Sequence, residues 1–253
     1  MNNPHSAKLT RYFRTTRLAI HILYGLFICG FILPKANARR RDLVISRWCK
    51  SLLAVLNIRI ITHGTLPDIN VTGTMFVANH VSWVDIHAVN SVRAVRFIAK
   101  SEIRGWPVFG WISEKVNTLF TERTKRSDAG RMVELTADCL RAGDCLCFFP
   151  EGTTSDGTEL KAFKGSLLQA AINAEAQIWP VTIRYPNADG SANTEMAYYA
   201  NISLLESIRK VLAQRSPVVE LHFSPPIATV GYERRGLSLQ ARQAIAHNLN
   251  LSH

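Results

Sequence analysis

The 253-residue sequence lacks the features of several large protein classes. It has no internal repeats and no low-complexity tracts, which argues against solenoids and disordered linkers. Its five cysteines are odd in number and include no C-x2-C pair, so neither a disulfide framework nor a zinc site is indicated. Cys145 and Cys147 alternate along an expected strand, where they would pack as small hydrophobic residues. This cysteine usage favours a reducing compartment.

Acidic residues are scarce in only one part of the chain. The formal net charge is +11, and residues 1–60 carry eleven of the 30 basic residues but only one of the 19 acidic residues, Asp42. The remaining chain is nearly neutral. The cations surround apolar residues and do not alternate with stacking aromatic side chains, so they argue against nucleic acid and favour an anionic membrane surface.

The chain also lacks an uninterrupted apolar run long enough to cross a bilayer. The longest run, 18–33, is interrupted only by His21, has sixteen residues and would span about 24 Å as a helix, against about 30 Å of hydrocarbon. A crossing helix would also place arginines on both sides of the membrane. These arginines are Arg11, Arg14 and Arg17 before the run and Arg39, Arg40 and Arg41 after it.

A second helix is expected over residues 43–56. Its apolar stripe comprises Trp48, Leu52, Val55 and Leu56. We expect it to lie in the membrane plane and to form, with the apolar run, a membrane-associated helical hairpin over residues 1–57. Ala36-Asn37-Ala38 resembles a signal cleavage site, but the arginines just beyond it disfavour export. The expected location is the cytoplasmic face of the inner membrane.

After residue 57, strand and helix patterns alternate through residues 58–253, which we expect to form the second domain. Strands are expected at 58–62, 75–78, 95–99, 118–121, 145–149, 178–185 and 218–223. Helices are expected at 83–92, 105–111, 127–143, 166–175, 204–213 and 237–249. This alternation predicts an α/β fold with a mostly parallel sheet and helices on both faces. In such sheets, ligands bind outside the carboxyl ends of the strands.

A histidine and an aspartate lie five residues apart just after the strand at 75–78. The first helical turn can bring His80 and Asp85 together, and a carboxylate on one imidazole nitrogen fixes the tautomer of a base that accepts a hydroxyl proton. A helix cap with a buried structural pair is the alternative. Ser82 lacks a G-x-S-x-G context and is expected to be a cap. His87 lacks the further ligands of a zinc site.

Two blocks, 79–85 (NHVSWVD) and 148–153 (FFPEGT), together resemble the glycerolipid acyltransferase family of the lysophosphatidate acyltransferase type. The resemblance covers about residues 58–227. It implies that His80 is the general base held by Asp85, and that Glu151, Gly152 and Thr153 position the acceptor. It also implies acyl-CoA or acyl-carrier protein as the donor, with no cofactor and no metal. The amides that start the helix after His80 are expected to stabilise the oxyanion.

The sequence departs from this family at two positions that concern phosphate. Phosphate-accepting relatives usually carry arginine where Thr154 stands, and a family glycine is replaced by Asn117, although the arginine six residues later is present as Arg123. Arg123 is expected to bind phosphate, with a solvated loop charge as the alternative. Lys161 and Lys164 resemble the family's lysine-bearing segment and are expected to supply the missing positive charge.

The expected function is that of a membrane-surface O-acyltransferase that converts lysophosphatidate to phosphatidate. Thr154 and Asn117 leave open a different acceptor, such as a lyso-ornithine lipid or a lysophospholipid. From other classes, a thioesterase that uses the same base on water and a catalytically silent lipid-binding protein are the alternatives. The expected partners are membrane lipids, the lysolipid acceptor and the acyl donor.

Overall fold

A computed structural model describes residues 6–121 and 126–250, without the side chains of residues 126–128. Within these residues, seven strands form one sheet in the order β1-β7-β6-β2-β5-β3-β4. The strands are β1 Arg59–Gly64, β2 Met75–Ala78, β3 Arg96–Lys100, β4 Leu119–Thr121, β5 Leu146–Phe148, β6 Ile178–Arg184 and β7 Val218–Phe223. All neighbouring pairs are parallel except β6 and β7.

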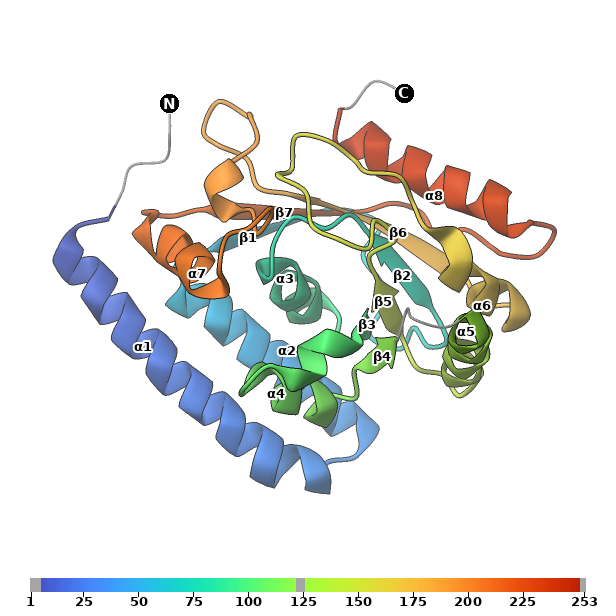
Figure 1. Cartoon of the computed structure of the whole chain (residues 1–253), viewed down its shortest axis with the longest axis horizontal. Coiled ribbons are helices and arrows are strands. Elements are labelled where there is room, and N and C mark those ends of the chain that lie inside the picture. Colours follow the sequence, from blue (N-terminus) through green and yellow to red (C-terminus); the bar gives the residue numbers. More distant parts are fainter. Residues whose placement is uncertain (1–5, 122–125, 251–253) are drawn as a thin grey trace.

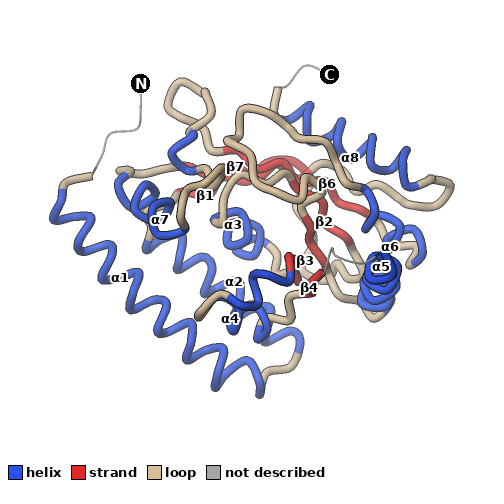
Figure 2. Tube along the Cα trace, in the orientation of Figure 1, coloured by secondary structure: helices blue, strands red, loops and turns tan. Residues whose placement is uncertain are grey.

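Helices cover both faces of this sheet, as Figures 1 and 2 show. They are α1 Lys8–Phe27, α2 Ala38–Val55, α3 Val84–Val92, α4 Phe109–Lys115, α5 Arg126–Arg141, α6 Leu168–Asn173, α7 Leu204–Ala213 and α8 Arg234–Asn248. Helices α2, α3 and α7 share one hydrophobic cluster with the sheet, and α5, α6 and α8 share another. The α/β fold class predicted from the sequence is confirmed.

The central strand β2 shows why two clusters form. Successive side chains of a strand point to opposite faces. Phe76 and Ala78 pack in the cluster that contains α3, and Met75 and Val77 pack in the cluster that contains α5. All four side chains are fully buried. A continuous apolar run is therefore what a strand covered on both faces requires.

The expected boundaries agree with the observed ones to within three residues for most elements after residue 57. The short helix expected at 105–111 is displaced, because the structure has a 3-10 segment at Ser101–Gly105 and then α4 at Phe109–Lys115. Pro107 explains the gap, since the residue before a proline is driven to extended backbone. Trp106 has φ −76° and ψ 127°.

The N-terminal helix is longer than its apolar run. It begins at Lys8 and continues from α1 through a π-helical segment, Ile28–Ile32, and a 3-10 turn, Leu33–Lys35. These 28 residues have an apolar window of mean hydropathy 1.8 and are long enough to cross a membrane by length and composition. The length argument against crossing is therefore wrong for the helix as a whole. The long apolar helix indicates membrane association.

The second arm of the hairpin packs differently from the prediction. Helix α2 begins five residues earlier than expected, where the Asn37 side chain accepts the Arg40 N–H at 2.9 Å. Leu52, Val55 and Leu56 are buried in the cluster that contains α3, so the apolar stripe faces the domain core and not lipid. Residues on both sides of position 57 therefore share one core. The division into two domains at that position stays a prediction.

Two of the flanking arginines turn inward. The Arg14 guanidinium is buried and donates to Gln214 O at 2.6 Å and Arg215 O at 2.9 Å, just beyond the end of α7. Arg41 donates to Leu33 O at 2.9 Å and to a carbonyl at the end of α4. Their charges stabilise helix ends. They do not face lipid headgroups as the sequence led us to expect.

Candidate active site

The chain after β2 is tied firmly to the neighbouring strand β6. Asn79 is buried, and its side-chain amide donates to Ile183 O at 2.9 Å and accepts from Ile183 N at 2.7 Å. These two bonds replace the backbone pairing that ends with the strand. His80, the next residue, is therefore held at the carboxyl edge of the sheet, where α/β folds bind ligands.

The structure brings His80 and Asp85 together. His80 Nδ1 lies 2.8 Å from Asp85 Oδ2, the Asp85 side chain is fully buried, and 19% of the His80 side chain is exposed. A carboxylate only accepts, so Nδ1 carries the proton and Nε2 holds the free lone pair. The Phe149 ring stacks on the imidazole at 3.8 Å with an interplanar angle of 7°. The imidazole is thus fixed in both orientation and tautomer.

Asp85 also caps the turn that carries His80. Its Oδ2 accepts the backbone N–H of Val81 at 2.7 Å and of Ser82 at 2.9 Å, and its Oδ1 accepts the hydroxyl of Tyr185 at 2.5 Å. The pair is therefore a helix cap and an oriented base at once. The Val81 and Ser82 amides, which precede α3, point to Asp85 and not to an oxyanion, and the expectation for the amides at the start of α3 itself stays a prediction.

Glu151 braces the same turn from the loop after β5. It is 3% exposed, and its Oε1 accepts His80 N at 2.7 Å while its Oε2 accepts Lys161 N at 2.9 Å. Burial raises the pKa of Glu151 above its ordinary value, and the two amide donors oppose that shift. Both carboxylate oxygens are committed to backbone amides. Glu151 therefore positions the His80 backbone, and the acceptor-positioning role that the resemblance implied for it stays a prediction.

The loop that follows Glu151 lies beside the dyad. Ser155 N donates to His80 O at 2.9 Å, and the Thr154 hydroxyl donates to Tyr198 O. Gly152 has φ +70°, a backbone conformation that favours glycine. Thr153 is exposed. This loop therefore turns sharply and leaves Thr153 accessible, while the Thr154 hydroxyl is occupied within the protein.

The two predicted lysines differ in their surroundings. Lys161 is half-buried, and its ammonium donates to Thr154 O at 2.7 Å, so it places a cation against the residue where relatives carry arginine. Lys164 is exposed, and its backbone N–H donates to Pro150 O at 2.7 Å. Arg123 lies outside the described residues. Of the two lysines, Lys161 therefore holds its ammonium against residue 154, and its expected role in phosphate binding stays a prediction.

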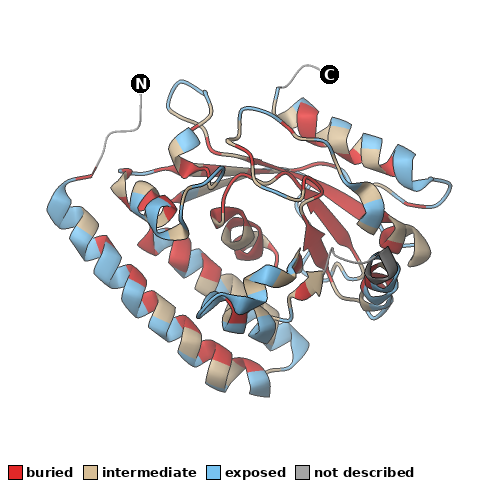
Figure 3. Ribbon diagram, viewed as in Figure 1, coloured by how far each residue is buried: buried red, intermediate tan, exposed pale blue. Residues whose placement is uncertain are grey.

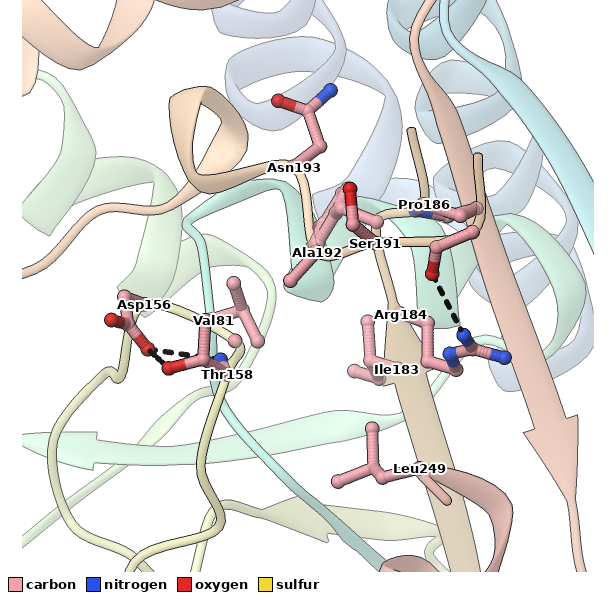
Figure 4. A pocket seen from close by; sticks show the side chains of 13 residues that line it. Val81, Asp156, Thr158, Ile183, Arg184, Pro186, Ser191, Ala192, Asn193 and Leu249 are labelled. Atoms are coloured by element: carbon pink, nitrogen blue, oxygen red, sulfur yellow. Dashed lines mark hydrogen bonds between the residues drawn. The ribbon is translucent and has the colours of Figure 1, made fainter. Parts of the chain in front are cut away.

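A cavity of about 250 Å³ lies at the same edge of the sheet. Figure 4 shows Val81, Asp156 and Thr158 on one side of it. On the other side lie Arg184, at the end of β6, and the segment 186–193 that follows. Asp156 accepts the backbone N–H and the hydroxyl of Thr158. These two bonds, mainly the one from the hydroxyl, lower the pKa of Asp156. Tyr185 lines this cavity and also bonds Asp85, so the cavity wall and the dyad share one side chain.

Two further polar side chains near the dyad, Ser82 and His87, contact other parts of the protein. Ser82 is fully buried, and its hydroxyl accepts the Val84 N–H at 3.4 Å. His87 points away from the dyad, with its Nδ1 3.7 Å from Cys49 Sγ on α2, and burial lowers its pKa to about 4. In the described part of the chain, no three His, Cys, Asp or Glu side chains group as metal ligands.

Sequence reasoning missed two side chains of this site, Tyr185 and Phe149. Phe149 lies within a recognised block, but nothing in its spacing indicates that it stacks on an imidazole. Tyr185 follows β6 and meets Asp85 across 100 residues of sequence. The available signal was that β6 and β2 are neighbouring strands, which requires knowing the strand order.

Comparisons with known proteins identify the family of the chain. Residues 59–184 match the acyltransferase family. The chain is 31% identical to the lyso-ornithine lipid O-acyltransferase of Pseudomonas aeruginosa, over 94% of this chain and 93% of that protein. It is 34% identical to the 1-acyl-sn-glycerol-3-phosphate acyltransferase of Neisseria gonorrhoeae, over 88% of this chain and 86% of that protein.

A solved structure shows the same fold. The 1-acyl-sn-glycerophosphate acyltransferase of Thermotoga maritima matches with a TM-score of 0.67 and 21% sequence identity, covering 94% of this chain and 96% of that one. The chain therefore belongs to the acyltransferase family, among enzymes of the lysophosphatidate and lyso-ornithine lipid acyltransferase type.

Proposed function

We propose that the protein transfers a fatty acyl group from acyl-CoA or acyl-carrier protein to the free hydroxyl of lysophosphatidate, giving phosphatidate. The observation that carries the proposal is the His80–Asp85 pair, whose Nδ1–Oδ2 distance is 2.8 Å at a partly exposed imidazole. An alcohol is a poor nucleophile at neutral pH, and a positioned base contributes about 10² to 10⁴ in rate.

The reaction proceeds without a covalent enzyme intermediate. His80 Nε2 takes the proton of the acceptor hydroxyl as the oxygen attacks the thioester carbonyl carbon. The new C–O bond forms a tetrahedral oxyanion, whose collapse breaks the C–S bond. The imidazolium, stabilised by Asp85, returns its proton to the leaving thiolate. These steps require no cofactor and no metal from the protein.

Lys161 supports a phosphate-bearing acceptor. Its ammonium is held at Thr154 O, 2.7 Å away, and retains two further N–H donors for phosphate oxygens. The Glu151 carboxylate ties the backbone of Lys161 to that of His80, so the cation and the base belong to one braced unit. In this proposal Lys161 binds the phosphate, assisted by the exposed Lys164 and by Arg123.

A second acceptor is favoured by one observation. The Thr154 hydroxyl is occupied by Tyr198 O, so position 154 supplies neither a charge nor a free donor. The Pseudomonas relative is named for a lyso-ornithine lipid, which is an acceptor without a phosphate group. The second candidate function is therefore O-acylation of a lyso-ornithine lipid by the same dyad.

The outer face of α1 supports action at a membrane surface. Large apolar side chains are exposed on α1 at Leu9, Tyr12, Phe13, Ile20, Leu23, Tyr24 and Phe27, and on the π-helical segment after it at Phe31. The opposite face packs on the domain, where a Cβ at Gly25 would lie 2.9 Å from the Trp48 ring, and Figure 3 shows the two faces. A helix that lies along a folded domain inserts parallel to the bilayer. We propose a monotopic protein on the cytoplasmic face.

An acceptor panel tests the function. Purified protein is given acyl-CoA or acyl-carrier protein with lysophosphatidate, lyso-ornithine lipid, lysophosphatidylcholine or no acceptor. We expect phosphatidate as the main product, and its loss in His80→Ala. Acylation of lyso-ornithine lipid alone would establish the second candidate. Fatty acid released at the same rate with and without acceptor would indicate a thioesterase, and no turnover would indicate a lipid-binding protein.

A further inference from the structure

Tyr185 directly follows β6 and reaches the buried carboxylate of the dyad. Its hydroxyl donates to Asp85 Oδ1 at 2.5 Å, and the Tyr185 side chain is itself buried. Burial and the adjacent carboxylate raise the pKa of Tyr185 well above its ordinary value, so the phenol keeps its proton and remains a donor. Tyr185 is therefore the donor and Asp85 the acceptor of this bond.

The two oxygens of Asp85 have unequal partners. Oδ2 accepts three donors, which are His80 Nδ1 and the amides of Val81 and Ser82. Within residues 6–121 and 126–250, Oδ1 accepts a hydrogen bond from Tyr185 and from no other group. A buried carboxylate oxygen without a donor is costly. Tyr185 therefore supplies the donor that Oδ1 needs, and together with the donors to Oδ2 it fixes the orientation in which the carboxylate directs Oδ2 at the imidazole.

The position of Tyr185 is itself fixed by the segment that follows it. Tyr185 O accepts the Asn193 N–H at 2.7 Å, and the buried Asn193 side chain donates to Gln214 Oε1 at 2.7 Å. Further along the same segment, Tyr198 N donates to Val81 O at 2.8 Å. The segment after β6 thus binds the dyad turn twice, once through backbone and once through the Tyr185 hydroxyl.

We propose that Tyr185 is a positioning residue for acyl transfer, acting through Asp85 on the basicity and orientation of His80. This inference rests on the proposed function, because it needs the dyad to be the catalytic base. Tyr185 does not touch the substrate in this proposal. Its hydroxyl spreads the charge of Asp85 over both oxygens, which keeps the dyad from binding its proton too tightly.

Tyr185→Phe tests the inference, because it removes one oxygen atom and preserves the ring. Loss of a hydrogen bond to a charged group predicts a roughly 10- to 100-fold lower kcat with little change in KM. Without that donor the dyad holds a proton more tightly, so the acid limb of the kcat/KM profile moves to higher pH. Tyr199→Phe is the matched control, since it removes the same group from an exposed position nearby. We expect it to behave like wild type.

A double-mutant cycle separates positioning from a merely structural role. If Tyr185 acts through Asp85, Tyr185→Phe has little further effect in the Asp85→Asn background. An additive loss of kcat, or an unshifted acid limb in Tyr185→Phe, overturns the inference. Melting temperatures identify a variant that fails to fold. If Tyr185→Phe does not fold, the same pH profile is measured with 3-fluorotyrosine at position 185. Its hydroxyl is a stronger donor, so the acid limb is expected to move to lower pH.

Failure of this inference can be distinguished from failure of the proposed function. Full activity in His80→Ala would show that His80 is not the catalytic base, and Tyr185 would then have no dyad to position. Loss of activity in His80→Ala and Asp85→Asn, together with a Tyr185→Phe variant indistinguishable from Tyr199→Phe, would remove only the positioning role.

Discussion

His80 and Glu151 are joined by a backbone bond and not by their side chains: the His80 N–H donates to Glu151 Oε1 at 2.7 Å. The turn that carries His80 is therefore held from two sides, by Asp85 from within the turn and by Glu151 from the loop after β5. The Glu151 carboxylate thus hydrogen-bonds the backbone of His80, and the Asp85 carboxylate hydrogen-bonds its imidazole. Two acidic residues that look alike in sequence thus serve different purposes, and mutation can distinguish them.

Loss of Asp85 should reduce the chemical step far more than substrate binding. In Asp85→Asn the amide cannot accept the Nδ1 proton and stabilise the imidazolium as a carboxylate does, so kcat is expected to fall on the order of 10³-fold with a modest change in KM. Steady-state kinetics with a fixed acyl donor measure this. His63→Ala, at an exposed histidine on β1, is the control and should retain activity. A change in KM alone would contradict the assignment of Asp85.

Loss of Glu151 should lower stability as well as activity. In Glu151→Ala the amides of His80 and Lys161 lose their acceptor, and each unsatisfied buried donor costs about 1 to 3 kcal/mol. We expect a lower melting temperature and a lower kcat in the same variant. Glu159→Ala, at an exposed position in the same loop, should change neither. An unchanged melting temperature in Glu151→Ala would show that the two bonds do not brace the turn.

Thr154→Arg should shift acceptor preference toward phosphate. The substitution sacrifices the hydroxyl bond to Tyr198 O but adds a guanidinium beside Lys161, and charge-assisted bonds to phosphate are stronger than neutral ones. We expect kcat/KM for lysophosphatidate to rise about 10-fold relative to lyso-ornithine lipid. Thr65→Arg adds the same charge at an exposed threonine outside the cavity lining and serves as the control. Equal shifts in both variants would point to a general charge effect.

Charges on the outer face of α1 should release the protein from membranes. Leu23 is 65% exposed and Phe27 is 52% exposed, so Leu23→Glu with Phe27→Glu leaves the core intact while removing apolar contact with lipid. Sedimentation with anionic vesicles measures binding, and we expect it to fall. Leu239→Glu, on α8, alters an equally exposed leucine on a different helix and should bind normally. Deleting residues 1–57 is a poorer test, because α2 belongs to the core.

The parts of the site that the sequence revealed are those with short-range causes. His80 and Asp85 are five residues apart, and one helical turn is enough to join them. The strands after residue 57 were equally clear, since a run buried on both faces is apolar throughout. Hydropathy identified the apolar run of α1, but it does not say which face of a helix the domain covers.

The missed contacts join distant segments. Tyr185 meets Asp85 across 100 residues, Glu151 meets His80 across 71, and Arg14 meets Gln214 across 200. Each depends on strand order or helix docking. Spacing within a motif carries no information about either.

His87 should make stability depend on pH in a definite direction. Burial, followed by the nearby His21, lowers its pKa from 6.5 to about 4. Its neighbours are Cys49 Sγ at 3.7 Å from Nδ1 and the Trp48 and Trp83 rings, at centroid distances of 5.6 and 6.0 Å. The unfolded chain binds a proton near pH 6.5, and the folded chain does so only near pH 4. The stability that neutral His87 contributes is therefore present above pH 6.5 and is lost as the pH falls to about 4.

Denaturant unfolding of wild type and His87→Gln from pH 7 to pH 4 measures this loss. The free energy of unfolding of wild type should fall by roughly 2 to 3 kcal/mol more than that of His87→Gln over this range, because each pKa unit of difference corresponds to about 1.4 kcal/mol. His63→Gln, at an exposed histidine, should follow wild type. Parallel curves for wild type and His87→Gln would mean that the imidazole is hydrated in the folded protein and that α2 and α3 do not seal it from water.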